Sequence, residues 1–187
     1  DHRDLHLSLR RQRQMCIRDR IRIEWNWIKK AIAKTLADYS GYTEGAKKSS
    51  SKSNHASVVK YIIAEDAKCT VGSDKVFGTD VDNDEVYALG TNFNCTDRTA
   101  SQIAESAIEA LKDFKNPYAN TTAAVEAGTG TDLASAKTEA ATANAHGIVY
   151  VAGDDTNDKV YVSTCHTKPC TTSGNKDIVF NELEVAE

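Results

Sequence analysis

Four of the five cysteines lie in polar, loop-like sequence and could form two disulfides. They are Cys69, Cys95, Cys165 and Cys170, whereas Cys16 stands apart in an arginine-rich stretch. An even number of loop cysteines is typical of proteins that fold in an oxidising compartment. Of the three pairings that four cysteines allow, we favour Cys69 with Cys95 and Cys165 with Cys170, because each of these pairs encloses a polar loop.

Zinc is an alternative for the last two cysteines, with His166 as a further ligand. Structural zinc sites usually present a CxxC pair together with a second pair of ligands. Cys165 and Cys170 have neither feature. We therefore favour the disulfide at this position.

Alternating carboxylates at Asp80, Asp82 and Asp84 are weak candidates for a calcium site. Calcium takes clustered carboxylate oxygens, and alternate aspartates begin an EF-hand loop. The sixth position of such a loop is Glu85 instead of glycine, and the twelfth is Thr91 instead of glutamate. We favour a solvated acidic turn and expect no metal and no cofactor.

No motif in the chain marks a catalytic site. The G-x-S-x-G, P-loop and G-x-G-x-x-G patterns are missing from the sequence. His55, His146 and His166 are candidate bases without a recognisable nucleophile beside them, and we expect His55 to be a packed or surface residue next to Val58. We therefore expect no enzyme, no catalytic residue and no small-molecule substrate.

A long helix is the first element that would position these residues. Val58, Val59, Ile62 and Ile63 recur at the spacing of one helical face, while Glu65 and its neighbours fall elsewhere. Residues 39–66 would span about 42 Å as one helix. A break between 39 and 53, at the polar SSSKS run, is an alternative to an exposed helical face. We expect a helix over 21–66 and a globular head over 67–187.

The head is predicted to contain two helices and several strands. Thr99 and Gln102 fit a capping box for a helix from about 100 to 114. The Ala-, Thr- and Gly-rich stretch that follows, to about 144, is expected to be either a mobile surface excursion or a weak third helix over 132–143. Runs rich in Val, Ile, Tyr and Phe predict an antiparallel meander over 147–152, 159–164 and 177–185, with short strands near 75–77 and 85–89. The predicted fold class is α+β, with a long N-terminal helix packed on a small antiparallel sheet and a second short helix.

Residues 1–20 differ from the rest of the chain. Their LRRQRQMCIRDR string resembles translated sequencing-adaptor sequence, so we expect a non-native or disordered segment. A basic arm for RNA or membrane is the alternative. Over 21–38 an apolar stripe alternates with Lys29, Lys30 and Lys34, which would be costly inside a bilayer.

Charge argues against nucleic acid as a dedicated partner. The net charge of −4 combines a basic N-terminus, with seven Arg and three Asp in residues 1–22, and a body with 16 basic and 24 acidic residues. Nucleic-acid binding needs basic residues clustered on the folded surface. The body of the chain does not have that composition.

A family resemblance covers about residues 39–187. Tyr39 and Tyr42, the Ala-Lys-Lys-Ser continuation, the run SNHASVVKYIIAEDAKC and KNPY at 115–118 resemble the helix and head of bacterial type IV pilins. The resemblance implies a structural subunit of an extracellular filament for adhesion, motility or DNA uptake, held in the bacterial inner membrane before assembly. Its partners would be copies of itself, joined through an apolar N-terminal helix, and other pilus assembly proteins.

Two other classes of protein are alternatives. One is a pseudopilin of a type II secretion system, and the other is an exported binding domain that uses its acidic loops. The family's leader and apolar span do not stand before Tyr39 in this chain. We therefore expect the chain as written to remain a monomer or small oligomer.

Overall fold

The computed structural model describes residues 2–73, 76–81, 84–87, 95–96, 98–130, 132–142, 146–168, 170 and 177–185. Side chains are described from residue 25 onward within these ranges, except over 79–87 and at 133. The chain divides into two compact units, residues 1–45 and 46–187, and each is described by itself.

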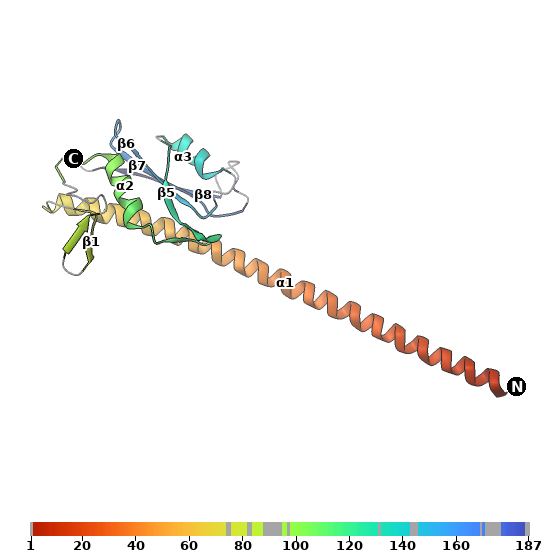
Figure 1. Cartoon of the computed structure of the whole chain (residues 1–187). Helices are drawn as coiled ribbons and strands as arrows, with labels where there is room; N and C mark the ends of the chain where they lie inside the picture. The colour runs from red at the N-terminus through yellow and green to blue at the C-terminus, as the bar shows by residue number, and fades with distance from the viewer. Residues whose placement is uncertain are drawn as a thin grey trace. The chain divides into compact units, whose positions relative to one another are not determined.

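Helix α1 (His2–Thr70) is longer than the sequence predicts (Figure 1). It includes residues 2–20, for which we expected a non-native or disordered segment; Arg and Leu, which are common there, are strong helix formers. The helix is also continuous through 39–53. Ser51 is buried, and its hydroxyl donates to the Lys47 carbonyl at 2.9 Å, so this polar residue is satisfied within the helix.

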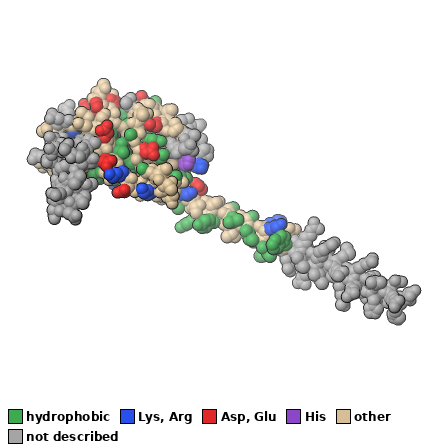
Figure 2. Space-filling model, in the orientation of Figure 1, with side chains coloured by type: hydrophobic (Ala, Val, Ile, Leu, Met, Phe, Trp, Pro, Cys, Tyr) green, Lys and Arg blue, Asp and Glu red, His purple; other side chains and the backbone are tan. Residues whose placement is uncertain are grey.

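In the first unit, α1 exposes large apolar side chains to solvent. The exposed fractions are 57% for Trp25, 42% for Ile28, 55% for Ile32 and 64% for Leu36. Figure 2 shows hydrophobic side chains at the surface of this part of the helix. The spacing of these residues predicted one helical face, and within the unit that face is uncovered.

In the second unit, α1 buries a stripe formed by Ser51, His55, Val58, Ile62 and Glu65. These positions are separated by three or four residues and therefore share one helical face. The buried stripe is rotated from the predicted one. Among the apolar residues of the predicted face, Ile63 remains 51% exposed, and the carboxylate that we placed elsewhere faces the core.

The main sheet has four strands in the order β5-β6-β7-β8. They are β5 (Val125–Ala127), β6 (Val149–Asp154), β7 (Lys159–Cys165) and β8 (Ile178–Glu184). The last three form the predicted antiparallel meander. Strand β5 was not predicted and pairs parallel to β6, so the sheet is mixed. Its three residues are too short to show a strand period within an Ala- and Thr-rich stretch.

Two further pairs of strands lie outside this sheet. Strands β1 (Gly78–Val81) and β2 (Asp84–Tyr87) form one antiparallel hairpin near the predicted positions. Strands β3 (Lys115–Asn116) and β4 (Ala119–Ala123) form a second one, which was not predicted.

Helix α2 (Ala100–Ala110) begins with the predicted capping box, in which the Thr99 hydroxyl accepts from the Gln102 N–H. It ends at Ala110 instead of 114, because the chain leaves the helix at Leu111 and enters β3. Helix α3 (Leu133–Ala140) lies within the predicted range.

The sheet is covered on both faces (Figure 1). The second unit of α1 and helix α2 contribute Val58, Ile62 and Ile103 to a core with the inward-facing valines of β5, β6 and β7. Helix α3 lies on the opposite face, where Lys137 contacts the Phe180 ring. A helix packed on an antiparallel meander is the α+β architecture that the sequence predicted.

Candidate functional site

A group of buried polar residues lies where α1 meets the end of β7. His55 is 2% exposed and forms two hydrogen bonds across the core. Its Nδ1 is 3.0 Å from Thr164 Oγ1 on β7, and its Nε2 is 2.8 Å from Asn181 Oδ1 on β8. Because an amide oxygen only accepts, Nε2 carries the proton and Nδ1 accepts from the threonine hydroxyl. Burial lowers the pKa of His55, and the bond to Asn181 opposes that shift.

This Thr-His-Asn chain has the residue types of a nucleophile, a base and an orienting group. A catalytic nucleophile must reach its substrate. Thr164 is 0% exposed and sits under α1. The geometry therefore supports a structural role, in which His55 connects the helix to two strands.

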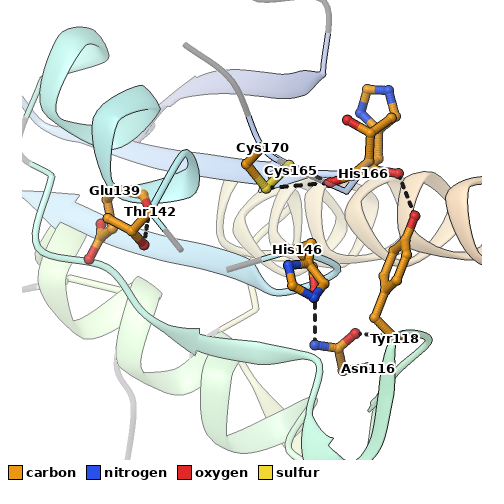
Figure 3. The surroundings of a disulfide bond; sticks show 9 residues. Asn116, Tyr118, Glu139, Thr142, His146, Cys165, His166 and Cys170 are labelled. Carbon is orange, nitrogen blue, oxygen red and sulfur yellow. Dashed lines mark hydrogen bonds between the residues drawn. A yellow bond between two sulfur atoms is a disulfide. The ribbon is translucent and has the colours of Figure 1, made fainter. Parts of the chain in front are cut away.

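His166 follows β7 and is 3% exposed. Its N–H donates to the Asp177 carbonyl, and its own carbonyl accepts from the Tyr118 hydroxyl at 2.9 Å (Figure 3). Its ring atom Nδ1 is buried and has no hydrogen-bond partner in the part of the chain that the structure describes. Burial, and secondly the nearby Lys52 and Lys48, lower the pKa of His166 to about 4.

A disulfide between Cys165 and Cys170 closes the loop that carries His166. Figure 3 shows this bond between Cys165 and Cys170. Cys165 Sγ is 3.1 Å from the Thr167 carbonyl. A cysteine binds zinc as a thiolate, and a disulfide sulfur is not a thiolate. The structure therefore favours the predicted disulfide over the alternative zinc site.

The third histidine, His146, lies on the other side of Tyr118. The two rings meet edge to face with centroids 5.2 Å apart, and the His146 carbonyl accepts from the buried Asn116 side chain. The structure thus gathers all three candidate histidines around the β7 end of the head, and among the described residues no accessible nucleophile is hydrogen-bonded to any of them.

The second predicted disulfide, between Cys69 and Cys95, lies at the C-terminal end of α1. Arg98 supports it, because its guanidinium donates to Asp66 Oδ1 at 2.9 Å and to the Cys95 carbonyl at 2.7 Å. Glu65 accepts from the N–H of Phe77 at 2.7 Å and fixes the turn that follows the helix. Phe77 needs this support, since its φ of 59° is unusual for a bulky residue.

A surface groove of about 490 Å³ lies between the end of α1, helix α2 and the edge strand β8. Its apolar floor includes Ile62, Ile103 and Leu183, and Glu184 is among its acidic residues. The sequence did not predict it, because its walls come from three segments far apart in the chain.

The weak calcium candidates cannot be judged from side chains. Asp82 lies outside the described residues, and only the backbone of Asp80 and Asp84 is described, on β1 and β2. Among the described residues, no three His, Cys, Asp or Glu side chains gather in a way that could hold a metal ion.

Comparison of the chain with protein-family models, with curated proteins and with solved structures finds no match. Within the part of the chain that the structure describes, no helix combines the length and the apolar character needed to cross a membrane.

Sequence reasoning missed the partners that bury the histidines. Thr164 was expected only as the last residue of a strand, and Asn181 as part of a strand near the C-terminus. The available signal was a histidine three residues before Val58 on the apolar helical face, which predicts burial and hence a need for polar partners. Which strands would supply those partners could not be read from the chain.

Acid is expected to destabilise the head well above the pH at which carboxylates titrate. His55 and His166 have lowered pKa values in the folded state, so the unfolded state binds more protons as the pH falls below about 6.5. The contribution of the two neutral histidines to the free energy of unfolding is therefore fully present above that pH, and it decreases as the pH falls toward 4. We expect a loss on the order of 1 kcal/mol between pH 7 and pH 5, measured by urea unfolding.

Carboxylates provide the internal control for this pH dependence. Asp132, Asp154 and Asp155 have pKa values lowered from 3.8 by hydrogen bonds, so their contribution is lost only below that pH. A His55→Gln, His166→Asn double variant should flatten the profile between pH 7 and pH 5. An unchanged slope in this variant would show that other groups cause the acid sensitivity.

Proposed function

We propose that this chain is the structural subunit of an extracellular filament of the type IV pilus class, with no active site in its head. The observation that carries the proposal is the architecture of the second unit. One face of α1 packs through Val58 and Ile62 on an antiparallel meander, and disulfides close the loops after the helix and after β7. A head that packs on one long helix and has two disulfide-closed loops suits a subunit that works outside the cell.

The uncovered apolar face of α1 in the first unit supports assembly through this helix. Side chains such as Trp25 and Leu36 are more than half exposed there. Contiguous exposed apolar surface is typical of protein–protein or membrane contact. In the proposed filament the N-terminal helices of neighbouring copies pack together, the heads face outward, and the unassembled subunit waits in the inner membrane.

The proposal is tested by restoring an apolar pilin helix ahead of Tyr39. The grafted chain is expressed in a pilus-competent host that lacks its own major pilin, and filaments are counted by electron microscopy. We expect filaments from the graft and none from the unmodified chain, since Lys29, Lys30 and Lys34 would be costly to bury without partners.

An Ile62→Asp version of the graft is the matched control. It keeps the apolar N-terminal helix but places a charge at a position that is 2% exposed, so the head should fail to fold and filaments should not form. A graft that folds and inserts but never assembles would contradict the pilin proposal. Filaments from the unmodified chain would instead contradict our interpretation of its first 38 residues.

The second candidate is an exported binding domain, and the groove beside β8 favours it. Apolar residues from α1, α2 and β8 meet acidic side chains there, as expected of a surface that binds a ligand. A pseudopilin remains a variant of the first proposal, because it would share the helix and the head.

A further inference from the structure

Two buried polar atoms lie side by side in the sequence after β7 without a partner. They are His166 Nδ1 and Thr167 Oγ1, and neither forms a hydrogen bond with any residue that the structure describes. A buried polar group without a partner is destabilising, and such groups are normally satisfied by a water, an ion or a ligand. Both atoms can donate a hydrogen bond, the imidazole nitrogen when it is protonated.

Lysines of α1 connect to His166 through Tyr118 and through their charge. Lys47 Nζ is 5.6 Å from the centroid of the Tyr118 ring, and the Tyr118 hydroxyl donates to the His166 carbonyl at 2.9 Å. This chain of contacts places the 47–52 turns of α1 next to the loop after β7. Lys48 and Lys52 are one turn apart on the helix and therefore point to the same side.

The charge around His166 is predominantly positive. Lys48 and Lys52 both act on it electrostatically, and Asp177 is the acidic group that opposes them. His55 also faces it from α1. Neither Lys48 nor Lys52 forms an ion pair within the described ranges of the chain, so their charge is available to an anion.

We propose that His166, Thr167, Lys48 and Lys52 form a binding site for a small oxyanion of the phosphate or sulfate type. The two ammonium groups supply charge, and the imidazolium and the hydroxyl supply directed hydrogen bonds, which together suit a tetrahedral oxyanion. Because His166 is 3% exposed, the site fits an ion of a few atoms better than a lipid headgroup or a polymer. The bound ion would hold His166 and Thr167 against α1.

Binding is expected to depend on pH. The neutral ring can donate from Nδ1 in one tautomer, but only the protonated ring adds a positive charge that attracts the anion, so the ion and the proton should bind together. In the empty protein the pKa of His166 is lowered to about 4, and a bound oxyanion should raise it. Sulfate, which keeps its double negative charge over this range, should therefore bind more tightly at pH 5.5 than at pH 8.

The test measures thermal unfolding of the full chain at pH 5.5 in an acetate buffer, with and without 20 millimolar sodium phosphate or sodium sulfate. Sodium chloride at the same ionic strength accompanies each sample. A site that binds only the folded state raises the melting temperature in proportion to the logarithm of ligand concentration. NMR of the imidazole nitrogens follows the titration of His166 under the same conditions.

Variants separate the site from a general salt effect. Lys48→Gln with Lys52→Gln should weaken phosphate binding by about tenfold or more, because both charge-assisted contacts are lost. Lys34→Gln with Lys60→Gln removes the same charge from exposed positions of α1 and should leave the phosphate response unchanged. His166→Asn should remove its pH dependence.

Three results would overturn the proposal. One is a rise in melting temperature with phosphate that is no larger than the rise with chloride. Another is a phosphate-dependent rise in melting temperature that is equal in the two lysine double variants. The third is a His166 titration that phosphate does not move, which would indicate a buried water as the partner of Nδ1. None of these results bears on filament assembly, which is tested separately.

Discussion

Replacing Gly153 by alanine should destabilise the head by about 3 kcal/mol or more, because the new methyl group has no space. A Cβ at this position would lie 2.3 Å from the carbonyl carbon of Ala100 and 2.3 Å from the N of Ser101. Both are backbone atoms at the start of α2, and Asp155 accepts from the Ser101 N–H at 2.7 Å. The helix cannot move away without losing this bond and its contacts with β6.

Urea unfolding of the Gly153→Ala variant at pH 7 measures this loss. Gly45→Ala is the matched control, because Cβ at that position in α1 meets no atom within 4 Å. Alanine is favoured over glycine in a helix by about 0.5–1 kcal/mol, so the control should be neutral or slightly stabilised. A Gly153→Ala protein as stable as the parent would show that α2 does not approach β6 as closely as described.

Removing the Cys69–Cys95 disulfide should cost about 3.5 kcal/mol, the other large effect that we expect. The two cysteines are 26 residues apart, so the bond closes a long polar loop in the unfolded chain. In the folded state it joins the end of α1 to the residue whose carbonyl Arg98 binds. A Cys69→Ala, Cys95→Ala double variant keeps the helix and removes only the crosslink.

The second disulfide supplies the comparison. Cys165 and Cys170 are five residues apart, so their removal should cost less, about 2 kcal/mol by the same loop-entropy argument. Peptide mapping without reductant first establishes both pairings. Urea unfolding of the two double variants then shows which disulfide contributes more to the free energy of unfolding. A larger loss for the short loop would mean that packing of the buried Cys165 outweighs loop entropy.

Local patterns in the sequence were sufficient for several elements. The capping box at Thr99 and Gln102 predicted the start of α2, since both partners lie within one helical turn. The β-branched and aromatic runs predicted the meander β6-β7-β8. The even number of cysteines in polar sequence predicted both disulfides, although Cys69 lies in the last turn of α1 and Cys165 ends β7. Each of these features depends on residues close in the sequence or on a residue type with one dominant use.

Other features depended on contacts between distant segments. The apolar spacing in α1 predicted a packed face, but the choice between Val58 with Ile62 and Val59 with Ile63 follows from where the sheet touches the helix. Strand β5 exists because Val125 lies beside Val149, and its own three residues carry no period.

The sequence by itself determined that this chain forms an α+β protein with a helical spine, two disulfide-closed loops and a C-terminal meander, because propensity, periodicity and capping act over short ranges. Only the tertiary structure decided which polar groups are buried and with whom. His55 meets Thr164 and Asn181 across more than 100 residues of chain, and the buried His166 has its pKa lowered by burial and by the charge of lysines on α1. The physical reason is that burial and electrostatic environment are properties of three-dimensional neighbours, which a one-dimensional spacing does not specify.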